Sequence, residues 1–208
     1  MRALLQPVWE PAATRLARLG VTADVLTALG LVLGLAAAGA AAARWWGWAL
    51  ALWLVSRTAD GLDGAVARVA RSASDRGGFL DIVADFTVYG AFVVGCAVGR
   101  PDARLALLVL LLTYYVNGTA FLAFSSVVER RRHDTALADE RSFVFARGLA
   151  EGTETILAHA LLVAFPAAMA VIAWAFAGVV AITVVQRVRL AVRVLADGDG
   201  AGHRGTSR

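Results

Sequence analysis

The residues best suited to chemistry are four aspartates inside otherwise apolar sequence, Asp60, Asp63, Asp81 and Asp85. An acidic side chain at the centre of a bilayer costs about 2.5–3.5 kcal/mol, so four of them need compensation. Hard divalent cations such as Mg²⁺ bind carboxylates together with substrate phosphates. Four aspartates offer ligands for two ions, which can clamp the attacking and leaving oxygens of a phosphoryl displacement. The pattern therefore predicts a divalent-metal site for phosphate chemistry at a membrane.

The spacing of these aspartates and their neighbours predicts two helical stripes. The first stripe contains Asp60, Asp63, Gly64, Ala67 and Arg68, and the second contains Gly77, Asp81 and Asp85. Within each stripe, intervals of about one turn place the side chains on one helix face. A short basic connection joins the two helices, so we expect antiparallel neighbours with facing stripes and one carboxylate cluster. The small residues leave both faces bare, so a bulky group can approach the backbone.

The elements that must position these residues are membrane helices. The 208-residue chain is 59% hydrophobic, with a mean hydropathy of +0.68, which is too apolar for a soluble domain of this length. A spanning helix needs about 20 mostly apolar residues. Six such stretches fill most of the chain, at 22–43, 47–70, 77–99, 103–127, 143–165 and 168–194. We therefore predict an all-α integral membrane protein with six transmembrane helices in one domain, residues 1–195.

The arginines predict the topology of these spans. They concentrate before the first span, in the second and fourth connections, and at the end of the last span. The positive-inside rule places these segments, both termini and the aspartate cluster in the cytoplasm. The lack of lysine and the abundance of alanine suggest a prokaryotic chain, and thus the inner (plasma) membrane. The net charge of +4 fits membrane lipids with anionic headgroups as partners, rather than nucleic acid.

The two ends of the chain are expected to lie outside the bilayer. Residues 1–19 alternate apolar and charged positions, which predicts an amphipathic juxtamembrane helix on the cytoplasmic surface. Residues 196–208 are polar and rich in glycine, so we expect a disordered C-terminal tail.

The full motif is Asp-x-x-Asp-Gly-x-x-Ala-Arg, then eight residues, then Gly-x-x-x-Asp-x-x-x-Asp. It resembles the signature of the CDP-alcohol phosphotransferase (CDP-alcohol phosphatidyltransferase) family, and every specified position is met. The resemblance implies a six-helix core preceded by a surface helix, and it implies a homodimer. One departure lies at the start of the first span, where the family commonly has Thr-Pro-Asn and this chain has Thr22-Ala23-Asp24. The role of Asp24 therefore stays open.

The resemblance also implies a reaction and roles for the motif residues. The reaction is transfer of a phosphatidyl group from CDP-diacylglycerol to a small alcohol acceptor, with release of CMP, in phospholipid synthesis. Two divalent ions, Mg²⁺ or Mn²⁺, would be held by Asp60, Asp63, Asp81 and Asp85, and Asp85 would also be the general base. The CDP part of the donor would be held by Asp60, Gly64, Ala67, Arg68 and Gly77.

The acceptor is less well determined by the sequence. An acceptor with its own phosphate would need further cations, for which Arg147 in the fifth predicted span and Arg187 in the sixth are candidates. Glu151 and Glu154 also lie near membrane depth. They pair with Arg147, contact the metal site, or favour an amino-alcohol acceptor such as serine or choline. For His159 we expect packing rather than acid–base chemistry.

Three alternatives remain open at this point. Arg57, three residues before Asp60, either holds a carboxylate or anchors the helix end. A CDP-choline or CDP-ethanolamine phosphotransferase acting on diacylglycerol would keep the fold, although the chain is shorter than eukaryotic enzymes of that type. A divalent-cation transporter would also place acids in the membrane. It would not need Ala67, Arg68 or Gly77 at fixed spacing.

Overall fold

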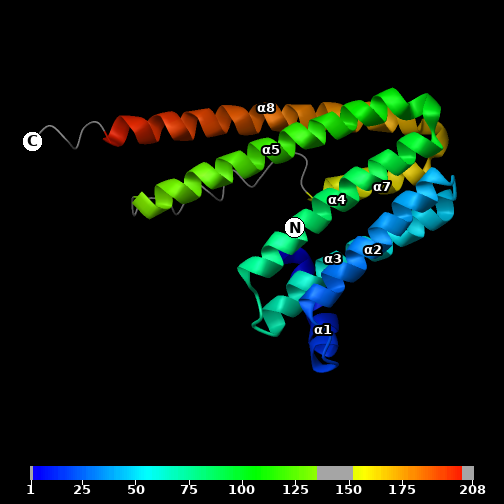
Figure 1. Ribbon diagram of the computed structural model, residues 1–208, viewed down its shortest axis with the longest axis horizontal. Helices are drawn as coiled ribbons and strands as arrows, with labels where there is room; N and C mark the ends of the chain where they lie inside the picture. The colour runs from blue at the N-terminus through cyan, green and yellow to red at the C-terminus, as the bar shows by residue number, and fades with distance from the viewer. Residues whose placement is uncertain (1, 135–151, 203–208) are drawn as a thin grey trace, which may run out of the picture.

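The computed structural model describes residues 2–134 and 152–202, and all regular elements in these two segments are helical (Figure 1). The α-helices are α1 (Arg2–Arg18), α2 (Ala23–Ala42), α3 (Trp46–Val69), α4 (Asp75–Gly99), α5 (Arg104–Asp134), α7 (Gly152–Ala164) and α8 (Met169–Gly202). Two short 3-10 helices, η1 (Pro101–Ala103) and η2 (Pro166–Ala168), form the turns before α5 and α8. The prediction of an all-α protein is confirmed.

Four stretches of the described chain are helical, long and apolar enough to cross a membrane. They are Ala23–Ala42, Asp75–Gly99, Pro101–Glu129 and Pro166–Ala196. Helix α3 has a suitable length of 24 residues, but its second half carries the charged residues of the motif. The described part of α7 has only 13 residues. The fold therefore supports four spans, and the two further spans stay a prediction.

The N-terminal segment forms α1, which packs along α3. Ala13 of α1 is fully buried in a small apolar cluster with Leu26 of α2 and Val66 of α3, and Trp9 packs against this cluster. A location of α1 on the membrane surface stays a prediction.

The last helix, α8, continues to Gly202. This end lies beyond position 196, at which the sequence predicts a disordered tail. Residues 203–208 of that tail lie outside the described residues.

Helix α2 is central to the group of helices that carries the aspartates. Both α3 and α4 pack along α2, whereas their own backbones approach each other closely at few positions. Small residues permit the close packing on α2. A Cβ added at Gly34 would overlap the side chain of Val88 on α4, and one added at Gly95 would overlap the carbonyl group of Ala38. Side chains rather than backbone therefore fill the space between α3 and α4.

The main apolar core joins this group to the remaining helices. Its fully buried large side chains include Trp53 on α3, Phe92 on α4, Leu110 on α5 and Leu162 on α7. Helices α5 and α8 pack against each other and continue together past the end of the α2–α4 group (Figure 1). The core anchors one half of α3 and α4, and the other half of each helix carries the motif.

Candidate metal and active site

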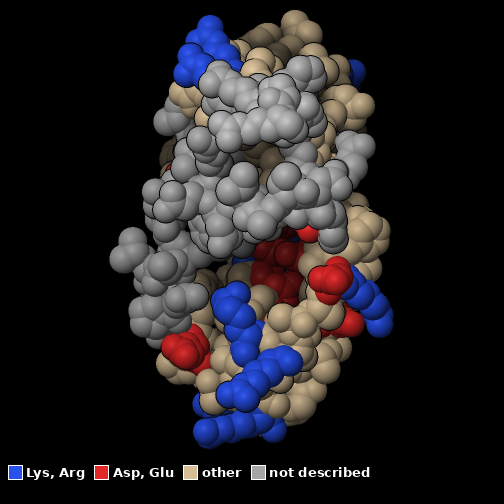
Figure 2. Space-filling model, turned by 90° about the vertical axis from the view of Figure 1, so that its left-hand side faces the viewer, with Lys and Arg blue, Asp and Glu red and all other residues tan. Residues whose placement is uncertain are grey.

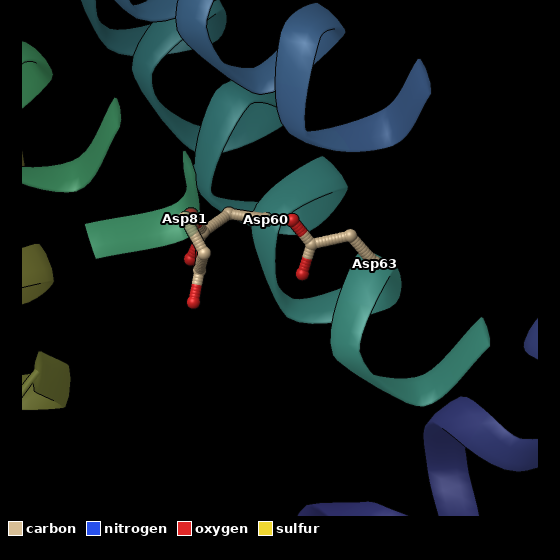
Figure 3. Close-up of side chains that lie close together, drawn as sticks. All are labelled: Asp60, Asp63 and Asp81. Atoms are coloured by element: carbon tan, nitrogen blue, oxygen red, sulfur yellow. The ribbon is translucent and has the colours of Figure 1, made fainter. Parts of the chain in front are cut away.

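Three of the four motif aspartates form one group between α3 and α4. Asp60 and Asp63 come from α3 and Asp81 comes from α4 (Figure 3). One carboxylate oxygen of each residue lies within 4.8 Å of the others, and Asp63 is buried whereas the other two are half-buried. A compact set of carboxylate oxygens is the ligand type that Mg²⁺ and Mn²⁺ prefer. The group therefore fits a divalent cation.

The first turns of α2 hold one member of this group in place. The Thr22 side chain caps α2 by accepting a hydrogen bond from the backbone N–H of Val25. One turn further on, the Thr27 hydroxyl donates a hydrogen bond of 2.6 Å to Oδ2 of Asp63. Hydrogen bonds to an ionised acceptor are stronger than neutral ones. Thr27 thus orients a carboxylate that has little access to solvent.

The fourth aspartate, Asp85, lies one turn beyond Asp81 but pairs with an arginine. Its Oδ1 accepts a hydrogen bond of 2.6 Å from Nη1 of Arg57, and the same Nη1 lies 3.5 Å from Oδ1 of Asp60. Arg57 is buried. Of the two functions that the sequence left open for Arg57, the structure shows that it holds carboxylates.

The residues implied in CDP binding lie where α3 ends and α4 begins, and they are Gly64, Ala67, Arg68 and Gly77. A Cβ added at Gly64 would meet Nη1 of Arg68 at 3.3 Å and no other group of the described chain within 4 Å. The N–H of Gly77 donates to the Ser74 hydroxyl, which caps α4, and a Cβ there would lie 4.0 Å from Oδ1 of Asp24. Neither Gly64 nor Gly77 places a side chain on its helix face.

The face of the molecule at this end is hollowed. Figure 2 shows acidic side chains inside a hollow, with arginines beside it. A cavity of about 240 Å³ also lies between α1 and the end of α3, lined by Trp9, Glu10, Ala65, Arg68 and Val69. The lining of this cavity combines charged and aromatic side chains from α1 and α3, and it includes none of the grouped aspartates.

Neither of the two acceptor candidates within the described segments, Glu154 and Arg187, joins the carboxylate group. Arg147 and Glu151 lie outside the described residues. Glu154 is exposed in the first turn of α7, and it is not one of the grouped carboxylates. Arg187 of α8 places its guanidinium 5.4 Å from the ring centroid of Phe121 on α5. Their roles stay predictions.

Two residues that hold the aspartates or their partner Arg57 in place were not predicted from the sequence. Thr27 lies 36 positions before Asp63, and no spacing rule connects the two. Tyr89, whose ring lies against the Arg57 guanidinium at 5.1 Å, follows Asp85 by four residues on the same helix. The continuing period of the second stripe could have revealed Tyr89, whereas Thr27 becomes visible only once α2 packs on α3.

Comparisons with known proteins agree with this geometry. A family model described as CDP-alcohol phosphatidyltransferase matches residues 20–185. The inner membrane protein YnjF of Escherichia coli (strain K12) is 38% identical over 164 residues, covering 78% of this chain and 79% of that protein. The Mycobacterium tuberculosis phosphatidylinositol phosphate synthase PgsA1 in complex with manganese and citrate has a TM-score of 0.65 at 25% identity, covering 88% of each chain.

The same mycobacterial enzyme with CDP-DAG bound has a TM-score of 0.66 at 24% identity, covering 89% of this chain and 94% of that one. This second match concerns the fold. The family model spans most of the chain, including the whole motif between positions 60 and 85. The chain therefore belongs to the CDP-alcohol phosphatidyltransferase family, and it is a transferase of that kind.

Proposed function

We propose that this protein transfers a phosphatidyl group from CDP-diacylglycerol to the hydroxyl of a small alcohol and releases CMP. The observation that carries the proposal is the compact group of Asp60, Asp63 and Asp81, on the motif that the family model includes. The PgsA1 structures hold manganese in one case and CDP-DAG in the other, which supports the same metal type and donor for this chain. Family membership also favours an enzyme over a cation transporter.

The residues around the group would hold the donor at the end of α3. The bare faces at Gly64 and Gly77 would admit the ribose and pyrophosphate, and Arg68, which is exposed, would contact a phosphate. Asp60, Asp63 and Asp81 would hold the divalent cation, with Asp85 completing the set of the implied two-ion site. When bound, Mg²⁺ or Mn²⁺ offsets the negative charge of a pyrophosphate.

Asp85 would act as the general base. It would accept the proton of the acceptor hydroxyl, the hydroxyl oxygen would attack the phosphorus next to the diacylglycerol, and the bond from this phosphorus to the oxygen of CMP would break. Most of the rate would come from positioning and charge stabilisation. Asp85 suits this role because it lies one turn from Asp81 and outside the group of three.

The proposed location is the inner membrane, with the active site and both termini in the cytoplasm. The relative YnjF is named an inner membrane protein, and the four long apolar helices support membrane insertion. Diacylglycerol chains would remain in the bilayer while the nucleotide enters from the cytoplasm. A homodimer remains part of the proposal through the family resemblance alone.

The test is CMP release by the purified protein in lipid nanodiscs with Mg²⁺ or Mn²⁺. CDP-diacylglycerol would be paired with glycerol 3-phosphate, inositol phosphate, inositol, serine, choline or phosphatidylglycerol, and CDP-choline would be paired with diacylglycerol. We expect release from CDP-diacylglycerol with one acceptor, loss on chelation with EDTA, and recovery with excess metal.

Asp81→Asn should abolish release, whereas Asp102→Asn, on the connection before α5, is the matched control and should keep it. Asp85→Asn should lose turnover while donor binding partly survives. Full turnover by Asp85→Asn would contradict the base assignment. Release from CDP-choline with diacylglycerol, and none from CDP-diacylglycerol, would establish the alternative donor.

A further inference from the structure

Arg57 has surroundings that charge neutralisation alone would not require. Its side chain is only 3% exposed, in the middle of α3. Nη1 contacts Asp85 at 2.6 Å and Asp60 at 3.5 Å. A buried charge is costly unless its geometry is good and its remaining donors are satisfied. The other contacts of this guanidinium therefore determine how far its position is fixed.

The guanidinium is held by a second hydrogen bond and by two aromatic rings. Nη2 donates a hydrogen bond of 3.1 Å to the Ser56 hydroxyl, which in turn donates to the carbonyl of Gly30 on α2 at 2.6 Å. The guanidinium carbon also lies over the rings of Trp53 at 5.3 Å and Tyr89 at 5.1 Å, and these two rings contact each other edge to face, with centroids 5.6 Å apart. A planar guanidinium packs on aromatic rings in a way that the ammonium group of lysine does not share. These contacts restrict rotation of the guanidinium, so that Nη1 points at Asp85.

The aromatic contacts of Arg57 continue into the apolar core. Trp53 packs on His159 of α7, with ring centroids 4.7 Å apart, and His159 packs on Tyr114 of α5 at 5.7 Å. The indole N–H of Trp53 also donates to the carbonyl of Ile156 at 3.1 Å. His159 is fully buried, and its Nδ1 lies 2.7 Å from the Thr155 carbonyl. The aromatic residues around Arg57 thus come from α3, α4, α5 and α7, and Arg57 joins this cluster to Asp85.

From this arrangement we infer that Arg57 is a positioning residue for Asp85 in the transfer reaction, an inference that rests on the proposed function. Its contact commits one oxygen of Asp85 and holds this carboxylate beside the group of Asp60, Asp63 and Asp81. A general base must be oriented as well as ionised, since its geometry decides whether it reaches the proton. Because Nη2 is bonded to Ser56, the planar guanidinium of Arg57 aims Nη1 at Asp85, which a charge alone would not do.

The experiment compares Arg57→Gln and Arg57→Lys with wild-type protein in the CMP-release assay. The matched control is Arg100→Gln, which breaks another arginine–aspartate contact, with Asp102 at the opposite end of α4. Mn²⁺ affinity measured by calorimetry serves as a readout independent of turnover, and a thermal melt reports folding.

For Arg57→Gln we expect kcat to fall about 100-fold, the loss typical of a misplaced catalytic group. The KM for CDP-diacylglycerol and the first Mn²⁺ affinity should change by less than about threefold, because the three grouped carboxylates remain. Arg57→Lys keeps the charge but not the planar guanidinium. Its kcat should therefore lie between those of wild type and Arg57→Gln, about tenfold below wild type. Arg100→Gln should match wild type.

Wild-type kcat in Arg57→Lys would overturn the inference, and so would a loss in Arg57→Gln confined to KM or to Mn²⁺ affinity. If Arg57→Gln does not fold, Arg57→Lys decides alone by the same criterion. A wild-type protein that releases no CMP with any donor and acceptor would instead refute the proposed function. The two failures are therefore distinguishable.

Discussion

A methyl group added at Gly64 should separate donor binding from stability. In the described chain this methyl would meet only the flexible end of Arg68, at 3.3 Å from Nη1. Alanine in a helix interior is more stable than glycine by about 1 kcal/mol. The free energy of unfolding of Gly64→Ala should therefore not fall. If the donor packs against this bare face, the methyl should cost about 1–3 kcal/mol of binding, which is about a 5- to 150-fold rise in Kd.

The control for this experiment is Gly61→Ala, one turn earlier on the same helix. Its methyl would lie 3.9 Å from Cζ2 of Trp9, an ordinary contact, so it should give the same helix stabilisation with no change in Kd. Binding of CDP-diacylglycerol to each variant protein, held in nanodiscs with Mn²⁺, gives the Kd for the donor. A thermal melt gives the stability. Equal donor affinities in the two variants would refute a donor contact at Gly64.

Two further substitutions test the packing around the site. His159→Phe should keep activity and should not lower the melting temperature, because the new ring can still stack on Trp53, and removal of the buried Nε2, which has no hydrogen-bond partner in the described structure, offsets the lost contact of Nδ1 with Thr155; a loss of turnover without unfolding would indicate acid–base chemistry at this position. Gly95→Ala should destabilise by about 1–3 kcal/mol, since its Cβ would overlap the backbone carbonyl of Ala38. Gly39→Ala is the control, with no group within 4 Å in the described structure, and equal melting temperatures for the two glycine variants would contradict this packing.

The sequence predicts the helices well because their ends carry local signals. The helix expected at 22–43 is observed as Ala23–Ala42, and the helix expected at 47–70 is observed as Trp46–Val69, whose role as a span stays a prediction. Apolar runs that end in polar or glycine-containing turns determine such limits without tertiary information. The limits of α8 differ because no proline interrupts the segment after Ala196, so the helix extends into residues assigned to the tail.

The sequence predicts one cluster of four aspartates, of which the structure groups Asp60, Asp63 and Asp81, and it does not show what orients them. Helical spacing places Asp60 and Asp63 on one stripe and Asp81 and Asp85 on another. It does not show that α3 and α4 meet mainly through side chains, because that depends on how both helices pack on α2. For the same reason Arg57 could not be assigned to Asp85, which lies 28 positions away. Contacts across helices require the packed structure.

The balance of charge gives the strongest physical reason to expect a cation at this site. Three carboxylate oxygens lie within 4.8 Å of one another. At an effective dielectric constant of about 20, two unit charges at this separation repel by about 3.5 kcal/mol, and the group contains three such pairs. Arg57 contributes one positive charge, and its shortest contact, 2.6 Å, is with Asp85 rather than with this group. The repulsion among Asp60, Asp63 and Asp81 therefore favours a divalent cation, and the cation in turn favours a donor that carries phosphates.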